Sequence, residues 1–155
     1  MGRQLKLGSA AANDIPNWQS TEISPHERGG FTDIERRWGP VLFLRCRATA
    51  RFNCHGLTFA ARRTEVSDQA TILMILTDDT YHEIPEAGVI PGDTILYFGD
   101  DGDVEHSGIV LTRPQDEPFR IPKVLSKWGK WAEVVHWANQ CPYSFPTAKY
   151  YRVQV

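Results

Sequence analysis

Residues 91–110 read PGDTILYFGDDGDVEHSGIV, and this stretch decides the fold. The run Thr94–Phe98 predicts a strand, and Pro91-Gly92 marks a turn that leads into it. Gly99–Gly102 supplies glycine and aspartate where a hairpin turn favours them. The chain then returns along residues 106–112. We therefore expect two antiparallel strands joined by a tight turn.

The segment before this hairpin predicts helices. Asn53 is a good N-cap for a helix from Cys54 to Ala61, and Ser67 for a second helix that carries apolar residues inward. Thr32 is expected to cap a short helix that ends at Gly39-Pro40. Residues 41–44 form an apolar run that fits a strand or a buried helical turn.

The segment after the hairpin predicts a third strand at 123–127, a short helix at 131–137 and a last strand at 150–155. Helices followed by an antiparallel meander describe an α+β domain, with the N-terminal helices packed on the C-terminal sheet. Residues 1–30 are rich in Gly, Ser, Asn and Pro and predict a loosely ordered arm with one short helix near Trp18. Residues 31–155 are expected to form one domain.

Composition narrows the class of protein. The chain has 155 residues, of which 41% are hydrophobic and 23% charged, as in ordinary globular proteins. Its net charge of −2 gives no reason to expect nucleic acid or an anionic membrane as a partner. Arginines crowd residues 36–63 and acidic residues crowd 78–105, which we interpret as two solvated faces. No apolar run reaches the ~20 residues of a membrane span.

The cellular compartment follows from cysteine number and the N-terminus. Three cysteines, Cys46, Cys54 and Cys141, cannot all pair with one another, so a reducing compartment is expected. Residues 1–12 lack the apolar core of a signal peptide. The predicted location is the cytoplasm, with export that needs no cleaved signal as the alternative.

Cys54 and His106 are the candidate catalytic pair. Cys54 opens a predicted helix, where backbone N–H groups and the helix dipole favour a thiolate. A histidine beside it is able to act as general base. Each residue alone is also explained by a structural role: Cys54 as a small buried apolar side chain, and His106 as an ordinary histidine in a strand. Together they predict a sulfur within about 4 Å of a ring nitrogen.

No metal or cofactor is expected. Cys46, Cys54, His55 and Cys141 lack the paired spacing of zinc ligands. The acidic loop at 100–105 lacks the periodic ligands and the closing glutamate of an EF-hand, and a hairpin turn accounts for it.

The order of these motifs resembles the circularly permuted papain-like cysteine hydrolases, the NlpC-like and CHAP amidase-peptidase group. In that group a helix-start cysteine packs against a meander sheet, a Gly-Asp pair opens one strand and a His-x-Gly-Ile/Val motif opens the next. Here these elements are Asn53-Cys54, Gly92-Asp93 and the pentapeptide HSGIV at 106–110. The resemblance covers roughly residues 50–130.

The tail adds a narrower likeness. Ser126-Lys127-Trp128-Gly129, the later Val135-His136 and Tyr150-Tyr151-Arg152 are similar to a poorly characterised bacterial branch with Asn-Cys, His and Ser-Lys-x-Gly motifs. No activity is firmly established for that branch, so this likeness implies none for the present chain.

The resemblance implies that Cys54 is the nucleophile and His106 its base. The oxyanion hole would come from the Cys54 backbone N–H and a nearby donor, with Asn53 among the candidates. The third position, which orients the imidazole, is Glu, Asn, Gln or His in this group. This chain offers Ser126 and Lys127 there, and a lysine ammonium cannot accept a hydrogen bond.

Two arrangements of the third position stay open. In one, Ser126 Oγ or a backbone carbonyl orients His106, and Lys127 binds a substrate carboxylate or a local acidic group. In the other, His136 is the third member and reaches in from the following helix.

The function implied is a thiol hydrolase, a cysteine peptidase or amidase acting on an amide bond of a peptide or of peptidoglycan. Two alternatives stay open. One is a catalytically impaired relative that serves as a binding module, and the other is an effector or toxin domain on the same fold. The sequence sets neither the substrate nor the oligomeric state.

Overall fold

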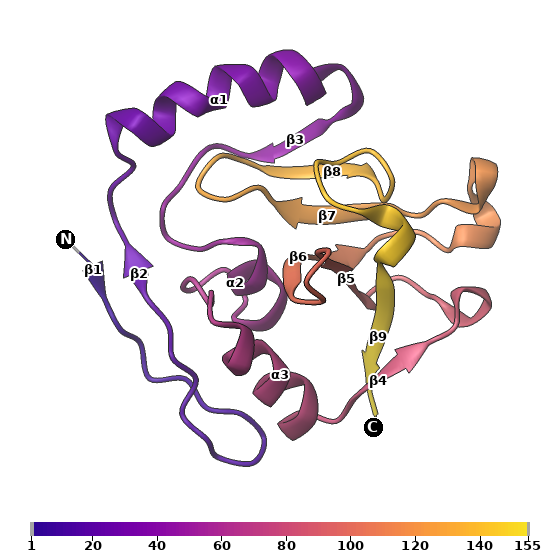
Figure 1. Cartoon of the computed structure of the whole chain (residues 1–155), viewed down its shortest axis with the longest axis horizontal. Helices are drawn as coiled ribbons and strands as arrows, with labels where there is room; N and C mark the ends of the chain where they lie inside the picture. The colour runs from indigo at the N-terminus through magenta and orange to yellow at the C-terminus, as the bar shows by residue number, and fades with distance from the viewer. Residues whose placement is uncertain (1, 155) are drawn as a thin grey trace.

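Seven strands form one antiparallel sheet in the computed structural model, which describes residues 2–154 (Figure 1). Their order in the sheet is β3-β8-β7-β6-β5-β9-β4, so β5, β6 and β7 form the predicted meander and β8 extends it by a strand that was not predicted. The strands are β3 (Phe43–Cys46), β4 (Tyr81–Ile84), β5 (Thr94–Phe98), β6 (Val104–Val110), β7 (Lys123–Lys127), β8 (Glu133–Trp137) and β9 (Lys149–Val153).

Three α-helices accompany the sheet, and the α+β class is confirmed. They are α1 (Pro25–Trp38), α2 (Cys54–Phe59) and α3 (Gln69–Asp78). A two-stranded sheet joins β1 (Gly2–Arg3) to β2 (Gln19–Ser20). Short 3-10 turns lie at η1 (Gly39–Val41), η2 (Glu86–Gly88), η3 (Pro114–Asp116), η4 (Pro118–Arg120) and η5 (Phe145–Thr147). None of the helices within residues 2–154 is long and apolar enough to cross a bilayer.

The large sheet has two differently covered faces. On one face Leu96 packs with α3 residues, and Leu125 packs with Leu57 of α2. On the other face Tyr97, Val124 and neighbouring apolar residues form the largest core cluster, and partly buried residues of α1 pack against it. Because side chains alternate along a strand, adjacent residues of β5, β6 and β7 serve opposite faces.

Two strong local signals are confirmed. Asn53 is the N-cap of α2, and its side chain accepts a hydrogen bond from the Gly56 amide. β5 and β6 form the predicted hairpin, with Tyr97 opposite His106. The expected strand at 123–127 is β7. The final strand ends at Val153, and residue 155 lies outside the described range.

The prediction of a helix at 131–137 is wrong, because residues 133–137 form β8. β8 pairs with β7 along its whole length and with β3 on its other side. Val134 is fully buried between these neighbours. β-branched residues favour a strand that is buried in a sheet, and here this preference outweighs the helical spacing of the tryptophans.

The beginning of α1 is also corrected. The helix begins at Pro25, and the predicted cap, Thr32, lies inside it. Ser24 is the true N-cap: its hydroxyl accepts from the Glu27 amide while the Glu27 carboxylate accepts from the Ser24 amide. This capping box, with Pro25 in the first turn, starts the helix despite Gly29-Gly30. In the same way Asp68, not Ser67, caps α3.

Residues 2–24 belong to the segment expected to be a loosely ordered arm, and the expected boundary at residue 30 falls inside α1. They pack against α3, since Leu7 and Ile15 are buried in its core cluster. The Asp78 carboxylate accepts hydrogen bonds from Ser9 and Asn13. No helix forms near Trp18, which makes an isolated bridge with Glu65. Residue 1 lies outside the described residues.

Candidate functional site

Cys54 is the first residue of α2, as predicted. Cys54 is 8% exposed, and the backbone amides of Ser107 in β6 and of His55 and Cys54 itself in α2 favour its thiolate. Burial outweighs these amides and raises the pKa of Cys54 to about 11. In this closed state the sulfur is therefore a protonated thiol at neutral pH.

The open edge of β6 explains how Cys54 reaches the backbone of Ser107. The pairing of β6 with β7 begins at Gly108 opposite Ser126 and does not include Ser107 or His106. The N-terminus of α2 lies at this unpaired part of the strand. The sulfur is consequently placed beside the part of β6 that is not paired with β7, next to the residue that follows His106.

His106 is completely buried, and neither of its ring nitrogens has a hydrogen-bond partner among the described residues. It leaves β6 on the side of Tyr97, opposite to the side on which Ser107 meets α2. Burial is the main cause that keeps the pKa of His106 well below its usual range, followed by the nearby imidazoles of His136 and His55. The ring is therefore neutral.

The hydrogen bond expected between Cys54 and His106 is not formed, because both nitrogens of the imidazole are unpartnered. The two groups nevertheless share a neighbour in Tyr143. The Tyr143 ring stacks on His106 with centroids 3.9 Å apart and an angle of 6° between planes. Burial, and then the negative charge that Cys54 carries when it is ionised, raise the pKa of Tyr143. Sequence reasoning missed this residue, for which no motif gave a signal.

A fully bonded polar group lies on the α2 side of β6. His55 Nδ1 is 2.8 Å from Ser107 Oγ, which is 2.9 Å from Thr58 Oγ1. Thr58 donates in turn to the Cys54 carbonyl at 3.0 Å. Burial lowers the pKa of His55 to about 4, so its ring is neutral. These bonds fix α2 on the sheet.

Ser126 does not orient His106 in this structure. Its hydroxyl lies 2.7 Å from His136 Nε2 and accepts from Trp128 Nε1 at 2.9 Å. His136 comes from β8, not from a helix, and its Nδ1 lies 2.8 Å from the Trp137 carbonyl. Burial lowers the pKa of His136 to about 4. Of the segment at 126–129, only Ser126 pairs with β6, opposite Gly108, and the Ser126 hydroxyl bonds to His136.

Lys127 is fully buried and is not placed to bind a substrate carboxylate. Its ammonium donates to the carbonyl oxygens of Thr49, Gly129 and Trp131 at 3.1, 2.6 and 3.2 Å. These bonds tie the β7–β8 turn to the segment that precedes α2. Burial lowers the pKa of Lys127 to about 8, and its positive charge favours the thiolate of Cys54.

The side chain of Asn53 is not a free oxyanion donor. Its Nδ2 donates to the Val66 carbonyl at 2.8 Å and to Ser67 Oγ at 3.2 Å, so both of its N–H groups are used. The amide of Ser107 is a better candidate to accompany that of Cys54, because it already acts on the sulfur. The alternation of side chains along the predicted strand did not indicate that the Ser107 amide is a candidate oxyanion donor.

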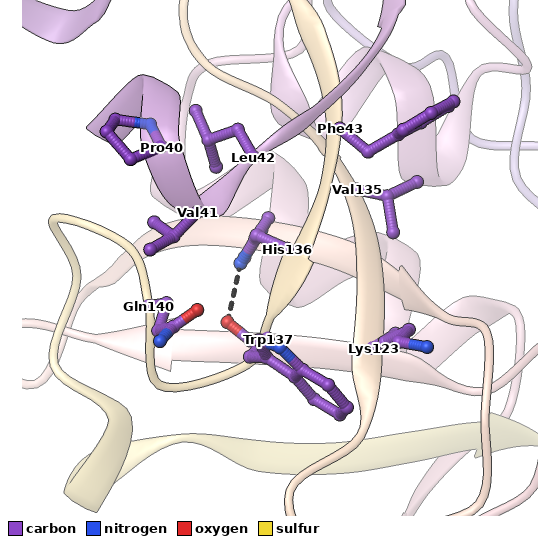
Figure 2. Close-up of a pocket in the computed structure, with 9 residues that line it drawn as sticks. All are labelled: Pro40, Val41, Leu42, Phe43, Lys123, Val135, His136, Trp137 and Gln140. Carbon is purple, nitrogen blue, oxygen red and sulfur yellow. Dashed lines mark hydrogen bonds between the residues drawn. The ribbon is translucent and has the colours of Figure 1, made fainter. Parts of the chain in front are cut away.

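A surface cavity of about 440 Å³ lies away from Cys54, against β3 and β8 (Figure 2). Phe43, Val135 and Trp137 line it, with Lys123 at its margin. Within residues 2–154, no three His, Cys, Asp or Glu side chains are grouped so as to hold a metal ion.

Comparison of this chain with known protein families, with curated proteins and with solved structures gives no match.

Proposed function

We propose that this protein is a thiol hydrolase of the papain-like, NlpC-like kind, with Cys54 as nucleophile and His106 as base. The observation that carries the proposal is the His106 imidazole, which is buried without a partner one residue from Ser107, whose amide favours the Cys54 thiolate. An unpaired buried polar group costs about 1–3 kcal/mol. Such groups in native proteins call for an explanation, and a catalytic role is one.

The chemistry would be acyl transfer. Cys54 Sγ attacks the carbonyl carbon of an amide while its proton passes to His106, and the amides of Cys54 and Ser107 stabilise the oxyanion. Collapse of the tetrahedral intermediate breaks the C–N bond, and His106 returns the proton to the leaving amine. Water, deprotonated by His106, then hydrolyses the thioester and restores the thiol. Peptides and peptidoglycan supply amide bonds of this kind.

The proposal requires the site to open. The pKa values of Cys54 and His106 are shifted in directions that disfavour the thiolate–imidazolium pair, with burial as the first cause of each. Entry of water or substrate beside Tyr143 removes that cause and leaves the amides and the Lys127 charge to favour the thiolate.

A second function, a binding module that keeps the fold, is favoured by the same shifts. A protonated thiol and a neutral imidazole with no hydrogen bond between them are the state expected of an impaired relative. The two functions make different predictions about the reactivity of Cys54.

Covalent labelling separates them. A dipeptide that carries an epoxide, applied at pH 6, should modify Cys54 of the hydrolase, and His106→Ala should slow this step by about 10²-fold or more. Peptide-mapping mass spectrometry measures both rates. Cys46, which is exposed, and Cys141, which is buried, serve as internal controls.

Labelling of Cys54 at the rate of Cys141, or equal labelling in the His106→Ala variant, would rule out the hydrolase and leave the binding module. The Cys54→Ala variant should also lose any cleavage of a peptide library or of peptidoglycan fragments.

A further inference from the structure

The outer edge of β3 is an open end of the large sheet. β3 is last in the strand order and pairs with β8 alone. Among residues 2–154, no other segment forms a backbone hydrogen bond with Phe43–Cys46. A strand with one free edge presents a row of N–H and C=O groups that are able to pair with another extended chain.

The exposed apolar side chains on β3 make this edge unusual. Phe43 is 65% and Leu44 54% exposed, and Val41, just before the strand, is 40% exposed. Phe43 lies opposite Val135, and both border the cavity of about 440 Å³. Figure 2 shows Phe43, Val135 and Trp137 around this hollow, with Lys123 beside Trp137. An added strand would place alternate side chains toward it.

The charge beside the edge is positive and unpaired. Arg45 and Arg47 are exposed and form no ion pair within the described range. The carboxylate that comes nearest through strand pairing, Glu133 opposite Cys46, is buried and bound by both Nε and Nη2 of Arg62. At the end of α1, the Arg37 guanidinium lies over the ring of Trp38, 5.3 Å from its centroid. This surface is therefore complementary to an acidic segment.

A second copy of this chain fits the edge poorly. Antiparallel pairing of two β3 strands centred on Arg45 would place the two Arg45 side chains directly opposite each other, and like charges on facing strands destabilise a pair.

We propose that the free edge of β3 binds an extended acidic segment of a partner protein, which adds to the sheet as a further strand. Backbone hydrogen bonds to Phe43–Cys46 would supply much of the affinity. The apolar side chains and the cavity would select every second residue, and Arg45 and Arg47 would select acidic residues. This surface is separate from Cys54, so the proposal does not depend on the hydrolase activity.

The test uses the full chain and a fluorescein-labelled decapeptide in which glutamate and valine alternate. Fluorescence anisotropy should show binding of this peptide and weaker binding of a decapeptide that alternates lysine and valine. Hydrogen exchange should slow at the amides of Phe43–Cys46 when the acidic peptide is added. An acidic peptide with N-methyl groups on alternate residues should bind more weakly, because it lacks donors for the strand edge.

Charge reversal gives the matched variants. The double variant R45E/R47E should bind the acidic peptide about tenfold more weakly or worse. The variant K6E/R113E makes the same change in net charge at exposed residues away from β3 and should bind like the unmodified chain. Circular dichroism verifies that both variants fold.

Equal affinity of the two double variants for the acidic peptide, or no protection of residues 43–46, would overturn the proposal. So would light scattering that shows a dimer whose formation R45E/R47E strengthens, since the occupant would then be a second copy.

Discussion

The two sides of β6 differ in whether their buried polar side chains have hydrogen-bond partners. On the α2 side the Ser107 hydroxyl meets both His55 and Thr58 within 2.9 Å. On the other side His106, the adjacent residue, has no partner for either ring nitrogen. Both residues are 0% exposed, so burial alone does not account for the difference. Hydrogen bonds are satisfied where a helix is held on the sheet and are left open where we place the chemistry.

The largest effect that we expect from these buried histidines is a loss of folding stability at acidic pH. Burial lowers the pKa values of His55 and His136 to about 4, and it keeps the pKa of His106 well below its ordinary value. The unfolded chain binds protons at these imidazoles below about pH 6.5, whereas the folded chain does not. Stability is therefore complete above pH 6.5 and falls as the pH drops toward 4. With three imidazoles the slope reaches about 4 kcal/mol per pH unit.

Urea unfolding at pH 7, 6 and 5 measures this slope, and His106→Phe assigns its share. The substitution removes one of the three titrating groups, so the slope should fall by about a third. An unchanged slope would mean that His106 is protonated in the folded chain, and the difference between the two sides of β6 would disappear.

A middle-sized effect is expected from Ser107→Ala on the bonded side. The substitution leaves His55 Nδ1 without its partner and removes one bond of Thr58. The free energy of unfolding at pH 7 should fall by about 2 kcal/mol. Ser144→Ala is the control, because that side chain is exposed, and it should stay within about 0.5 kcal/mol of the unmodified chain. Equal effects of the two substitutions on the free energy of unfolding would contradict the hydrogen bonds that the structure gives to Ser107.

The smallest effect is expected from His106→Phe at pH 7. Phenylalanine removes two unpaired nitrogens and keeps a ring to stack on Tyr143, so stability should be unchanged or rise by up to about 1 kcal/mol. Denaturant unfolding gives this difference. A loss of more than about 2 kcal/mol would show that the imidazole has a bonded partner after all, and it would remove the main support for a catalytic role.

Local signals account for what the sequence predicted well. Asn53 caps α2 through its own side chain, and the hairpin turn between β5 and β6 depends on glycine and aspartate within a few positions. The capping box of Ser24 and Glu27 is an equally local signal, but the Gly, Ser, Asn and Pro content of residues 1–30 predicted a loosely ordered arm there. The local sequence did not predict β8, because this segment is a strand only through its pairing with β7 and β3.

The same division applies to the candidate site. The position of Cys54 at the start of a helix follows from its neighbours in the sequence, and strand alternation separates His106 from Ser107. The bond between Ser126 and His136 depends on the register of β7 against β8, which no local pattern encodes. Tyr143 reaches His106 from a loop after β8, and one of the carbonyls that bind Lys127, that of Thr49, lies 78 positions away in the sequence. Such contacts exist only once the sheet has formed.

The place of β9 in the sheet bears on how the chain folds during synthesis. β9 lies between β5 and β4, although it is the last of the strands to leave the ribosome. The ion pair of Lys149 with Glu83 spans 66 positions, so β4 emerges long before its partner. Until then β4 has no strand beside it and β5 lacks one neighbour. Pairings of such long range are slow to form and leave edges exposed to aggregation. Production of this protein should therefore benefit from a chaperone that shields nascent strands.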